Sequence, residues 1–257
     1  MTILVTGGAG YIGSHMALAL ADRGEDVVVL DNLSTGLRWA VPPAAELVEG
    51  DIGDEVLLDG LMRSRRFDAV VHFAGSIVVP ESVRDPLAYY LNNTVKSRAL
   101  LAATVRAGIP RFIFSSTAAV YGNPVSQPVY EDALPSPISP YGSSKLMTEW
   151  MLRDVHAAHG LQYVALRYFN VAGADPQGRT GQSTPRATHL IKVACQTALG
   201  QRGALEIFGT DYQTPDGKCL RDYIHVCDLA DAHVLGLRML LAEGGSHVFN
   251  LGTGSGY

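Results

Sequence analysis

A tyrosine and a lysine four residues apart are the first residues in this sequence that could move protons. Tyr141 and Lys145 follow Ser139-Pro140, a pair typical of a helix start, and an i, i+4 spacing places both side chains on one helical face. A tyrosine with a pKa of about 10 is a poor base, but a nearby ammonium ion and a cationic cofactor ring favour the phenolate and lower that pKa. The pair could then take a hydroxyl proton while hydride leaves the same carbon. Tyr-x-x-x-Lys also occurs by chance on surface helices.

A run of hydroxyl residues ends a strand expected at residues 112–115. Ser115, Ser116 and Thr117 lie at its carboxyl end, where ligands of α/β proteins bind. Thr117 could therefore donate or accept a hydrogen bond at a reacting oxygen. Ser115 and Ser116 fit equally well as caps of the backbone in a turn.

The first expected strand ends in a glycine-rich turn. Gly10 and Gly13 combine with either Gly7 or Gly8 in spacings that let the chain turn sharply and a pyrophosphate approach closely. The helix expected from about Tyr11 offers unpaired N–H groups and a positive dipole end to phosphates. Such a turn can also do no more than join a strand to a helix, but its place between the first strand and the first helix favours dinucleotide binding.

An acid after the second expected strand extends this interpretation. Asp31 lies 18 residues beyond Gly13, where a carboxylate can accept hydrogen bonds from a ribose diol and repel a 2′-phosphate. This favours NAD over NADP as the cofactor, although Asp-Asn is also a good turn pair. Asp51-Ile52, after the third strand, could frame an adenine with a carboxylate and an aliphatic side chain.

The elements that must position these residues alternate between strands and helices. The expected strands are apolar throughout, as parallel strands covered on both faces are, and span residues 3–6, 26–30, 46–49, 69–73, 112–115 and 163–166. The helical patterns between them span residues 11–23, 54–64, 86–107 and 140–159. This order predicts an α/β fold, a doubly wound parallel Rossmann-type sheet.

The character of the sequence changes after Arg167. We expect a loop at 168–186, a helix at 187–200 and a short apolar stretch at 204–208. A polar loop at 209–221, a second helix at about 226–243 and a strand at 247–249 should follow. The prediction is therefore an NAD-binding domain of residues 1–167. A smaller substrate-binding lobe of residues 168–257 would be interwoven with the last strands of the sheet.

Composition excludes several classes of function. The 257 residues are 47% hydrophobic and carry a net charge of −5 without any charged block, which argues against nucleic-acid and membrane-surface binding. No apolar run is long enough to span a bilayer, and the N-terminus lacks the pattern of a signal peptide. Cys195, Cys219 and Cys227 have no metal-binding spacing, so we expect no metal and reduced thiols in a cytoplasmic protein.

Six stretches together resemble the UDP-glucose 4-epimerases, a family of extended short-chain dehydrogenases. They are TGGAGYIGSH (6–15), LDNLSTG (30–36), VHFAG (71–75), SPYGSSK (139–145), LRYFN (166–170) and LRDYIHV (220–226). The resemblance covers essentially the whole chain in the family's order. It implies reversible oxidation at sugar C4, interconverting UDP-glucose and UDP-galactose, with NAD kept bound and recycled.

The resemblance also implies the site residues. Tyr141 would be the base, Lys145 its electrostatic partner, and Thr117 would stand where the family often has Ser. The implied NAD site contains Gly7, Gly10, Tyr11, Ile12, Gly13, Asp31, Asn32, Leu33, Ser34, Thr35, Gly36, Asp51, Ile52, Phe73, Ala74, Gly75, Asn92, Tyr141, Lys145 and Phe169. The implied UDP-sugar site contains Thr117, Tyr141, Asn170, His189, Leu190, Glu206, Ile207, Phe208 and Arg221.

The resemblance has further consequences outside the site. It implies a homodimer through the helices at 86–107 and 140–159, whose apolar residues, Leu146, Met147, Trp150 and Met151 among them, extend beyond one face. Packing against the sheet is the alternative explanation for those side chains. The family continues well beyond Tyr257, so we expect the substrate-binding lobe to be incomplete at its C-terminal end.

Two departures and several rival activities complete the sequence interpretation. Ile77 stands where some members have a phosphate-binding Lys, and His189 where some have Asn. Related 4,6-dehydratases need an Asp-Glu pair after the Thr, where this chain has Ala118-Ala119, and decarboxylases usually carry a Glu near this hydroxyl. A 4-epimerase of UDP-glucuronate, UDP-xylose or UDP-N-acetylglucosamine stays open. A non-catalytic NAD-sensing protein would be expected to have lost the Tyr–Lys pair.

Overall fold

A parallel sheet forms the centre of the molecule. The computed structural model describes residues 1–124, 126–184 and 188–256. Within these, the sheet has the order β3-β2-β1-β4-β5-β6-β9, with every neighbouring pair parallel. The strands are β1 (Thr2–Thr6), β2 (Asp26–Asp31), β3 (Glu46–Glu49), β4 (Ala69–His72), β5 (Arg111–Ser115), β6 (Gln162–Tyr168) and β9 (Ser246–Leu251). The doubly wound fold predicted from the sequence is confirmed, and its strand order reverses between β1 and β4.

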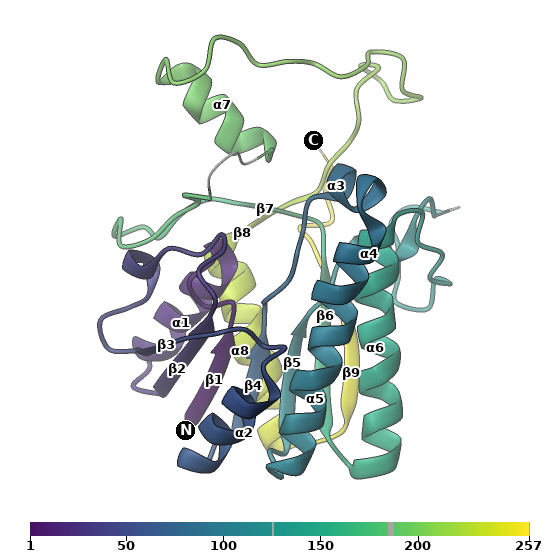
Figure 1. Cartoon of the computed structure of the whole chain (residues 1–257). Helices are drawn as coiled ribbons and strands as arrows, with labels where there is room; N and C mark the ends of the chain where they lie inside the picture. The colour runs from purple at the N-terminus through teal and green to yellow at the C-terminus, as the bar shows by residue number, and fades with distance from the viewer. Residues whose placement is uncertain (125, 185–187, 257) are drawn as a thin grey trace.

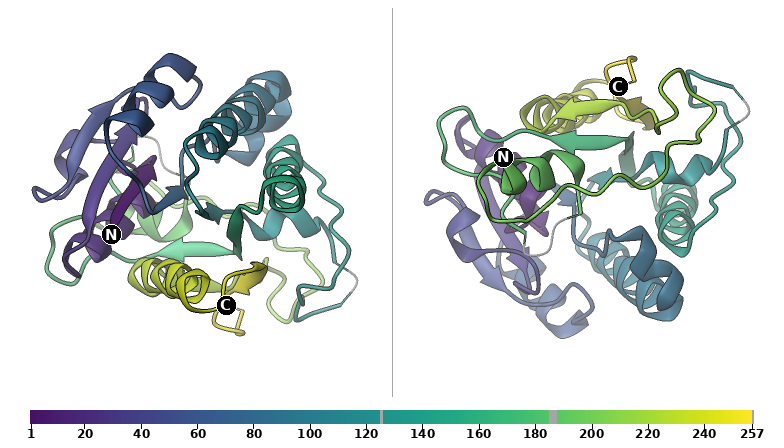
Figure 2. Two further views of the ribbon diagram at one scale, coloured as in Figure 1. Left: turned by 90° about the horizontal axis from the view of Figure 1, so that it is seen from below. Right: turned by 90° about the horizontal axis from the view of Figure 1, so that it is seen from above.

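Helices cover both faces of this sheet (Figure 2). One face carries α1 (Tyr11–Ala21) and α8 (Val226–Ala242), which contact each other, and the other carries α2 (Glu55–Ser64), α5 (Lys96–Arg106) and α6 (Pro140–His159). Side chains alternate along each strand, so Leu4 is buried under α2 and α5 while Ile3 and Val5 are buried under α1 and α8. Each such side chain contributes about 1.5–3 kcal/mol when fully buried, which explains why central strands such as β1 and β4 are apolar, whereas the edge strand β3 begins and ends in Glu.

The segment predicted as one helix at 86–107 is helical but not uniform. It consists of α4 (Pro86–Tyr89), a wider π-helical stretch η2 (Tyr90–Val95), and α5. A short helix, α3 (Val79–Arg84), and two single 3₁₀ turns, η1 (Arg38–Ala40) and η3 (Ala118–Tyr121), were not predicted, because segments this short show no periodicity. In Figure 1, α3 and α4 lie at the top of the face covered by α5 and α6.

The chain beyond β6 builds a second, smaller sheet. Its two strands, β7 (Asn170–Ala172) and β8 (Tyr223–His225), pair in parallel near the carboxyl end of the main sheet, and α7 (Leu190–Ala198) lies beyond them (Figure 1). The prediction of a continuous loop over 168–186 is wrong at two places: β6 extends to Tyr168, and Asn170–Ala172 form β7. Strands of three residues whose partner is some fifty residues away leave no local pattern. The predicted start of the helix at Ala187 lies outside the described residues.

The end of the chain returns to the main sheet. After β8, α8 packs on α1, and β9 pairs with β6 along its whole length. A division into residues 1–167 and 168–257 stays a prediction. None of the described helices is both long and apolar enough to cross a membrane.

Candidate active site

The glycine turn lies where the strand order reverses. Gly7 has φ +71°, and a Cβ there would stand 2.5 Å from the backbone nitrogen of Ala74 at the end of β4. A Cβ on Gly13 would stand 2.2 Å from the carbonyl oxygen of Gly7. Only glycine fits both positions, so α1 begins tightly against β1, with Gly10 as its N-cap. The unpaired N–H groups at the start of α1, beginning with Tyr11, form a cradle suited to phosphate.

Asp31 joins this turn to the loop after β2. Its carboxylate accepts hydrogen bonds from the backbone N–H groups of Ala9, at 2.9 Å, and Leu33, at 2.8 Å. Each carboxylate oxygen has a second lone pair, so Asp31 can still accept hydrogen bonds from a ribose. The structure thus brings together the glycine turn and the acid that sequence spacing paired. The remaining predicted loop residues, Asn32, Ser34, Thr35 and Gly36, continue from this point.

Asp51 forms a second acidic position beside the first. It accepts hydrogen bonds from Asn32, at 3.0 Å, from Lys96, at 2.7 Å, and from the N–H of Gly53, at 2.8 Å. Burial would raise the pKa of Asp51, but these three donors outweigh it and lower that pKa. Asp51 is therefore ionised and fixed near Asn32, whereas Ile52 is buried in the core.

The end of β4 forms the next wall of the site. Phe73, Ala74 and Gly75 follow directly, and the ring of Phe73 packs against His233 of α8 with centroids 4.9 Å apart. Asn92 donates to the Ser76 hydroxyl at 2.9 Å. Sequence reasoning missed the neighbouring Asn93, a buried side chain that accepts from the Ser76 N–H at 2.7 Å and donates to the Ser144 hydroxyl at 3.0 Å.

The π-helical turn η2 places both asparagines at this wall, and Asn93 links the wall to α6. An asparagine pair inside an expected helix was the only available sequence signal for Asn93. Ile77, which stands where a phosphate-binding Lys was considered, is 51% exposed.

The start of α6 holds Tyr141 and Lys145. The Ser139 hydroxyl caps the helix by accepting the N–H of Gly142 at 3.2 Å, and Pro140 presets the first turn. Lys145 is 4% exposed, with its ammonium 4.7 Å from the centre of the Phe114 ring on β5. Thr117, just beyond β5, is 8% exposed and hydrogen-bonds Tyr141.

Burial sets the electrostatics of this pair. It raises the pKa of Tyr141, and the hydrogen bond with Thr117 only partly opposes the effect. Burial also lowers the pKa of Lys145 to about 8, against the attraction of Glu149. The lowered pKa expected for Tyr141 from the sequence involved both Lys145 and a cationic cofactor ring; in the polypeptide alone, burial dominates. Lowering the pKa of Tyr141 needs a further positive charge.

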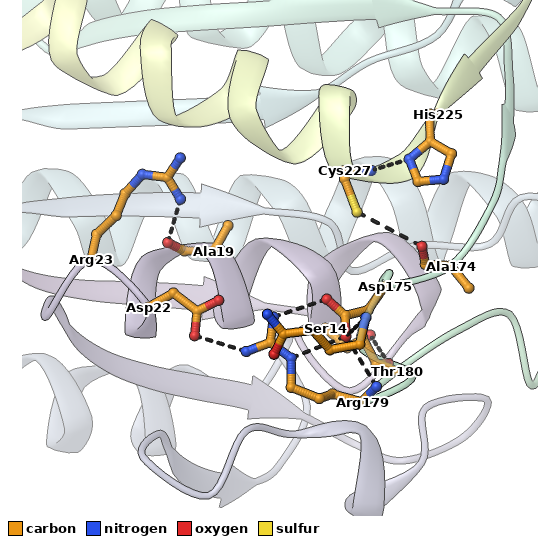
Figure 3. Close-up of polar contacts among 11 residues, drawn as sticks. Ser14, Ala19, Asp22, Arg23, Ala174, Asp175, Arg179, Thr180, His225 and Cys227 are labelled. Atoms are coloured by element: carbon orange, nitrogen blue, oxygen red, sulfur yellow. Dashed lines mark hydrogen bonds and ion pairs between the residues drawn. The ribbon is translucent and has the colours of Figure 1, made fainter.

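A strap of residues 173–181 lies across α1 (Figure 3). The Tyr11 hydroxyl donates to the Gly173 carbonyl at 2.7 Å, and the Ser14 and Thr180 hydroxyls are 3.0 Å apart. Arg179 lies between two carboxylates, 2.9 Å from Asp175 and 2.9 Å from Asp22 at the end of α1. The strap thus fastens the helix of the glycine turn to the segment that follows β7.

Part of the predicted substrate site gathers where β7 meets β8. Asn170 donates both its backbone and its side-chain N–H to the carbonyl of Asp222, each at 3.1 Å, which brings Asn170 beside Arg221. Arg221 is exposed, as is Phe169 between β6 and β7. The remaining predicted residues lie exposed around α7, beyond the carboxyl end of the sheet. They are His189, the N-cap of α7, Leu190 in its first turn, and Glu206, Ile207 and Phe208 after it.

The described residues define a class of protein. Four features together are typical of a dinucleotide-binding short-chain dehydrogenase. They are a parallel sheet in this order, a glycine turn where the strand order reverses, an acid after β2, and a Tyr–Lys pair at the start of α6. A family model described as the NAD dependent epimerase/dehydratase family matches residues 3–252, and the chain belongs to that family.

Individual relatives are close to the chain in sequence and in structure. A UDP-glucose 4-epimerase of Azospirillum brasilense is 67% identical, covering 99% of this chain and 73% of that protein. A UDP-glucose 4-epimerase from Brucella ovis, solved in complex with NAD, superposes with a TM-score of 0.97 at 50% identity, over 100% of this chain and 78% of that one. A UDP-glucose 4-epimerase from Bifidobacterium longum, solved in complex with NAD⁺ and UDP, superposes with a TM-score of 0.95 at 38% identity. The superposition covers 100% of this chain and 79% of that one.

Proposed function

We propose that this protein is an NAD-dependent epimerase that interconverts UDP-glucose and UDP-galactose by reversible oxidation at C4 of the sugar. The observation that carries the proposal is the meeting of Tyr141, Lys145 and Thr117 at the carboxyl edge of the sheet. On the same edge, β4 separates them from the glycine turn after β1, and β4 and β1 separate them from Asp31 at the end of β2. The relatives' names support the choice of sugar nucleotide.

The residues divide the proposed chemistry between them. Bound NAD⁺ supplies a reversible hydride acceptor and a positively charged ring. The cradle at Gly10 and the carboxylate of Asp31 fit its pyrophosphate and ribose. The Tyr141 oxygen takes the proton of the 4-hydroxyl and later returns it, while Thr117 hydrogen-bonds at the same place. Lys145, as a cation, stabilises the phenolate form of Tyr141.

Inversion requires the nucleotide to be held more tightly than the sugar. The 4-ketone must present its other face to the hydride donor, so the uridine diphosphate serves as the anchor. Arg221 is exposed beside Asn170, and a guanidinium fits a diphosphate bidentately. The exposed apolar side chains of Leu190, Ile207 and Phe208 suit a uracil ring.

The same wall of the site argues against elimination. Ala118 and Ala119 form the turn η3 directly after Thr117, at the place where a dehydratase needs an Asp-Glu pair. Methyl groups cannot exchange protons with C5 or C6 of a sugar. Reversible oxidation at C4 alone therefore suits this wall better.

We further propose that two copies of the chain pair through α3–α6. Val83, Leu87, Leu91 and Val95 recur every fourth residue and are each at least 50% exposed, and Trp150 on α6 is 48% exposed. Such a contiguous exposed apolar stripe is typical of an interface. Not every apolar residue of α6 contributes, because Leu146 and Met151 pack into the interior. The three free cysteines support a reducing compartment, the cytoplasm.

The test of the proposed activity supplies UDP-galactose and no NAD. We expect UDP-glucose to form, because the cofactor stays bound and is regenerated in each turnover. Tyr141→Phe should lower kcat by about 10²–10⁴-fold, the usual contribution of a general base. The assay is run on this chain and on a chimera that adds the part of the Azospirillum brasilense relative that this chain does not cover. The proposal fails if the chimera gives no turnover or if Tyr141→Phe matches the parent.

A further inference from the structure

A buried ion pair lies one helical turn beyond Lys145. Glu149 of α6 and Arg167 of β6 are 5% and 6% exposed, and the guanidinium donates to both carboxylate oxygens at 2.6, 3.0 and 3.2 Å. Sequence reasoning passed over both residues. Positions 141, 145 and 149 nevertheless repeat every four residues, which places Glu149 on the catalytic face of the helix.

The pair is tied to the wall that carries Thr117. The Ser116 hydroxyl donates to Glu149, and Arg167 donates to the Tyr121 hydroxyl at 2.7 Å. Tyr121 in turn donates to Asn250 of β9 at 2.7 Å. The cluster therefore joins the end of β5, the turn η3, α6 and the last two strands of the sheet.

Stability alone does not account for such a cluster. Buried ion pairs are often no more stabilising than well-packed apolar residues of similar volume, because both charges lose their hydration. Holding two elements in a fixed relation is one use for which a buried polar cluster is kept. Here the elements held are those that carry Thr117 and Lys145.

We propose that Glu149 is a positioning residue of the reaction proposed above, on which this inference rests. Through Ser116 it fixes the segment that carries Thr117 against α6, and its carboxylate, paired with Arg167, lies one turn from Lys145. Removing the charge of that carboxylate should make Lys145 lose its proton at lower pH.

The other groups around Lys145 do not supply this charge. Tyr141 is neutral at pH 7 because burial raises its pKa, and His72 of β4 is uncharged there because burial and Lys145 lower its pKa to about 3. Arg167 is a cation that opposes Glu149 from β6. Glu149 is the anion that raises the pKa of Lys145 against the effect of burial.

The direct test follows the ionisation of Lys145 by NMR. The chain has four lysines, so ¹³C-lysine labelling gives few signals, and Lys145→Met identifies the one that matters. We expect Glu149→Gln to move the titration midpoint of Lys145 down by about one pH unit, the size expected for removing one negative charge a helical turn away. Ser116→Ala keeps the charge and should leave the midpoint unchanged.

Kinetics then separate positioning from charge. In the active enzyme with NAD, Ser116→Ala should lower kcat several-fold and Glu149→Gln about tenfold, with KM for UDP-galactose within about twofold. The alkaline limb of kcat should move to lower pH only in Glu149→Gln. Glu149→Asp retains the charge and should restore the limb.

Variants that lose the fold do not leave the question open. Glu149→Gln leaves Arg167 unpaired, so the double variant Glu149→Gln/Arg167→Met, with no unpaired charge, serves as a second test. It should still shift the Lys145 midpoint downward, but by less than Glu149→Gln, because the opposing cation is removed as well. An unchanged midpoint in a folded Glu149 variant overturns the charge role, and an unchanged kcat in Ser116→Ala overturns the positioning role. If the parent turns over no UDP-galactose, the proposed function fails, while the NMR titration still decides the effect of Glu149 on Lys145.

Discussion

At the scale of single residues, burial works against the charged forms that catalysis needs. Tyr141 is harder to deprotonate and Lys145 easier to deprotonate than in water. The ammonium of Lys145 is an unfavourable buried cation, and Glu149 offsets only part of the effect of burial on its pKa. The spacing of Tyr141, Lys145 and Thr117 was visible in the sequence. The direction of the pKa changes was not, because burial is a property of the packed structure.

A buried cation at this position should lower stability in a pH-dependent way. The pKa of Lys145 is about 8 in the folded chain against a reference of 10.5, so below pH 8 the lysine is charged in both states and the penalty is complete. Between pH 8 and 10.5 the unfolded chain binds more protons, so the parent gains stability as pH rises. We therefore expect Lys145→Met to be about 1–3 kcal/mol more stable than the parent at pH 7, with a smaller difference at pH 10.

Urea unfolding of the cofactor-free proteins at both pH values measures this difference. The cofactor is removed because bound NAD would stabilise the parent selectively. A less stable Lys145→Met at pH 7, or a difference that does not shrink by pH 10, contradicts the electrostatic account.

At the scale of elements, the strap over α1 connects two parts of the site. Hydrogen bonds from Arg179 lower the pKa of Asp175 to about 2, so this contact is complete at neutral pH and weakens only as pH falls from about 4 towards 2. The strap bonds to Tyr11 and Ser14 of α1 and directly follows β7, so it ties these two elements together. The strap could not be predicted from the local sequence, because the residues of α1 that it contacts lie some 160 residues earlier in the chain.

Asp175→Asn should release the strap. The variant loses the charge that holds Arg179 and the backbone N–H groups of Gln177 and Arg179, so the Arg179–Thr180 bond should become about tenfold more sensitive to trypsin at pH 8. Mass spectrometry of the fragments identifies the cleavage. Asp216→Asn, which removes a local contact in an exposed loop, is the matched control and should leave this rate unchanged. Equal rates in Asp175→Asn and the parent count against the strap.

At the scale of the whole molecule, the sequence determined the main sheet better than the smaller lobe. The central strands are apolar runs such as β1 and β5, and two of the long helices have a side-chain cap, Asp54 on α2 and Ser139 on α6. In contrast, β7 and β8 consist of three residues each and exist only because they pair with each other. The glycine turn, Asp31 and the Tyr141–Lys145 pair could therefore be predicted from spacing, whereas Phe73, Ala74 and Asn92 beside them came from the family resemblance. Glu206, Ile207 and Phe208 rested on the family resemblance alone.

The exposed stripe on α3, α4 and η2 should control association. We expect the parent to sediment as a dimer at micromolar concentration and Leu91→Asp to sediment as a monomer, because a carboxylate in the centre of an apolar interface loses its hydration. Leu235→Asp, an exposed leucine on α8 across the sheet, should remain dimeric. A parent that is monomeric, or a Leu91→Asp variant that stays dimeric, rules out this interface.

The central claim is that hydride leaves C4 and returns to the same carbon within one active site. UDP-galactose deuterated at C4, incubated in ordinary water with no added NAD, tests it directly. The account predicts UDP-glucose that retains the deuterium at C4, read by mass spectrometry and NMR. Loss of the deuterium to water, or formation of UDP-glucose by Tyr141→Phe at the parent rate, would contradict it.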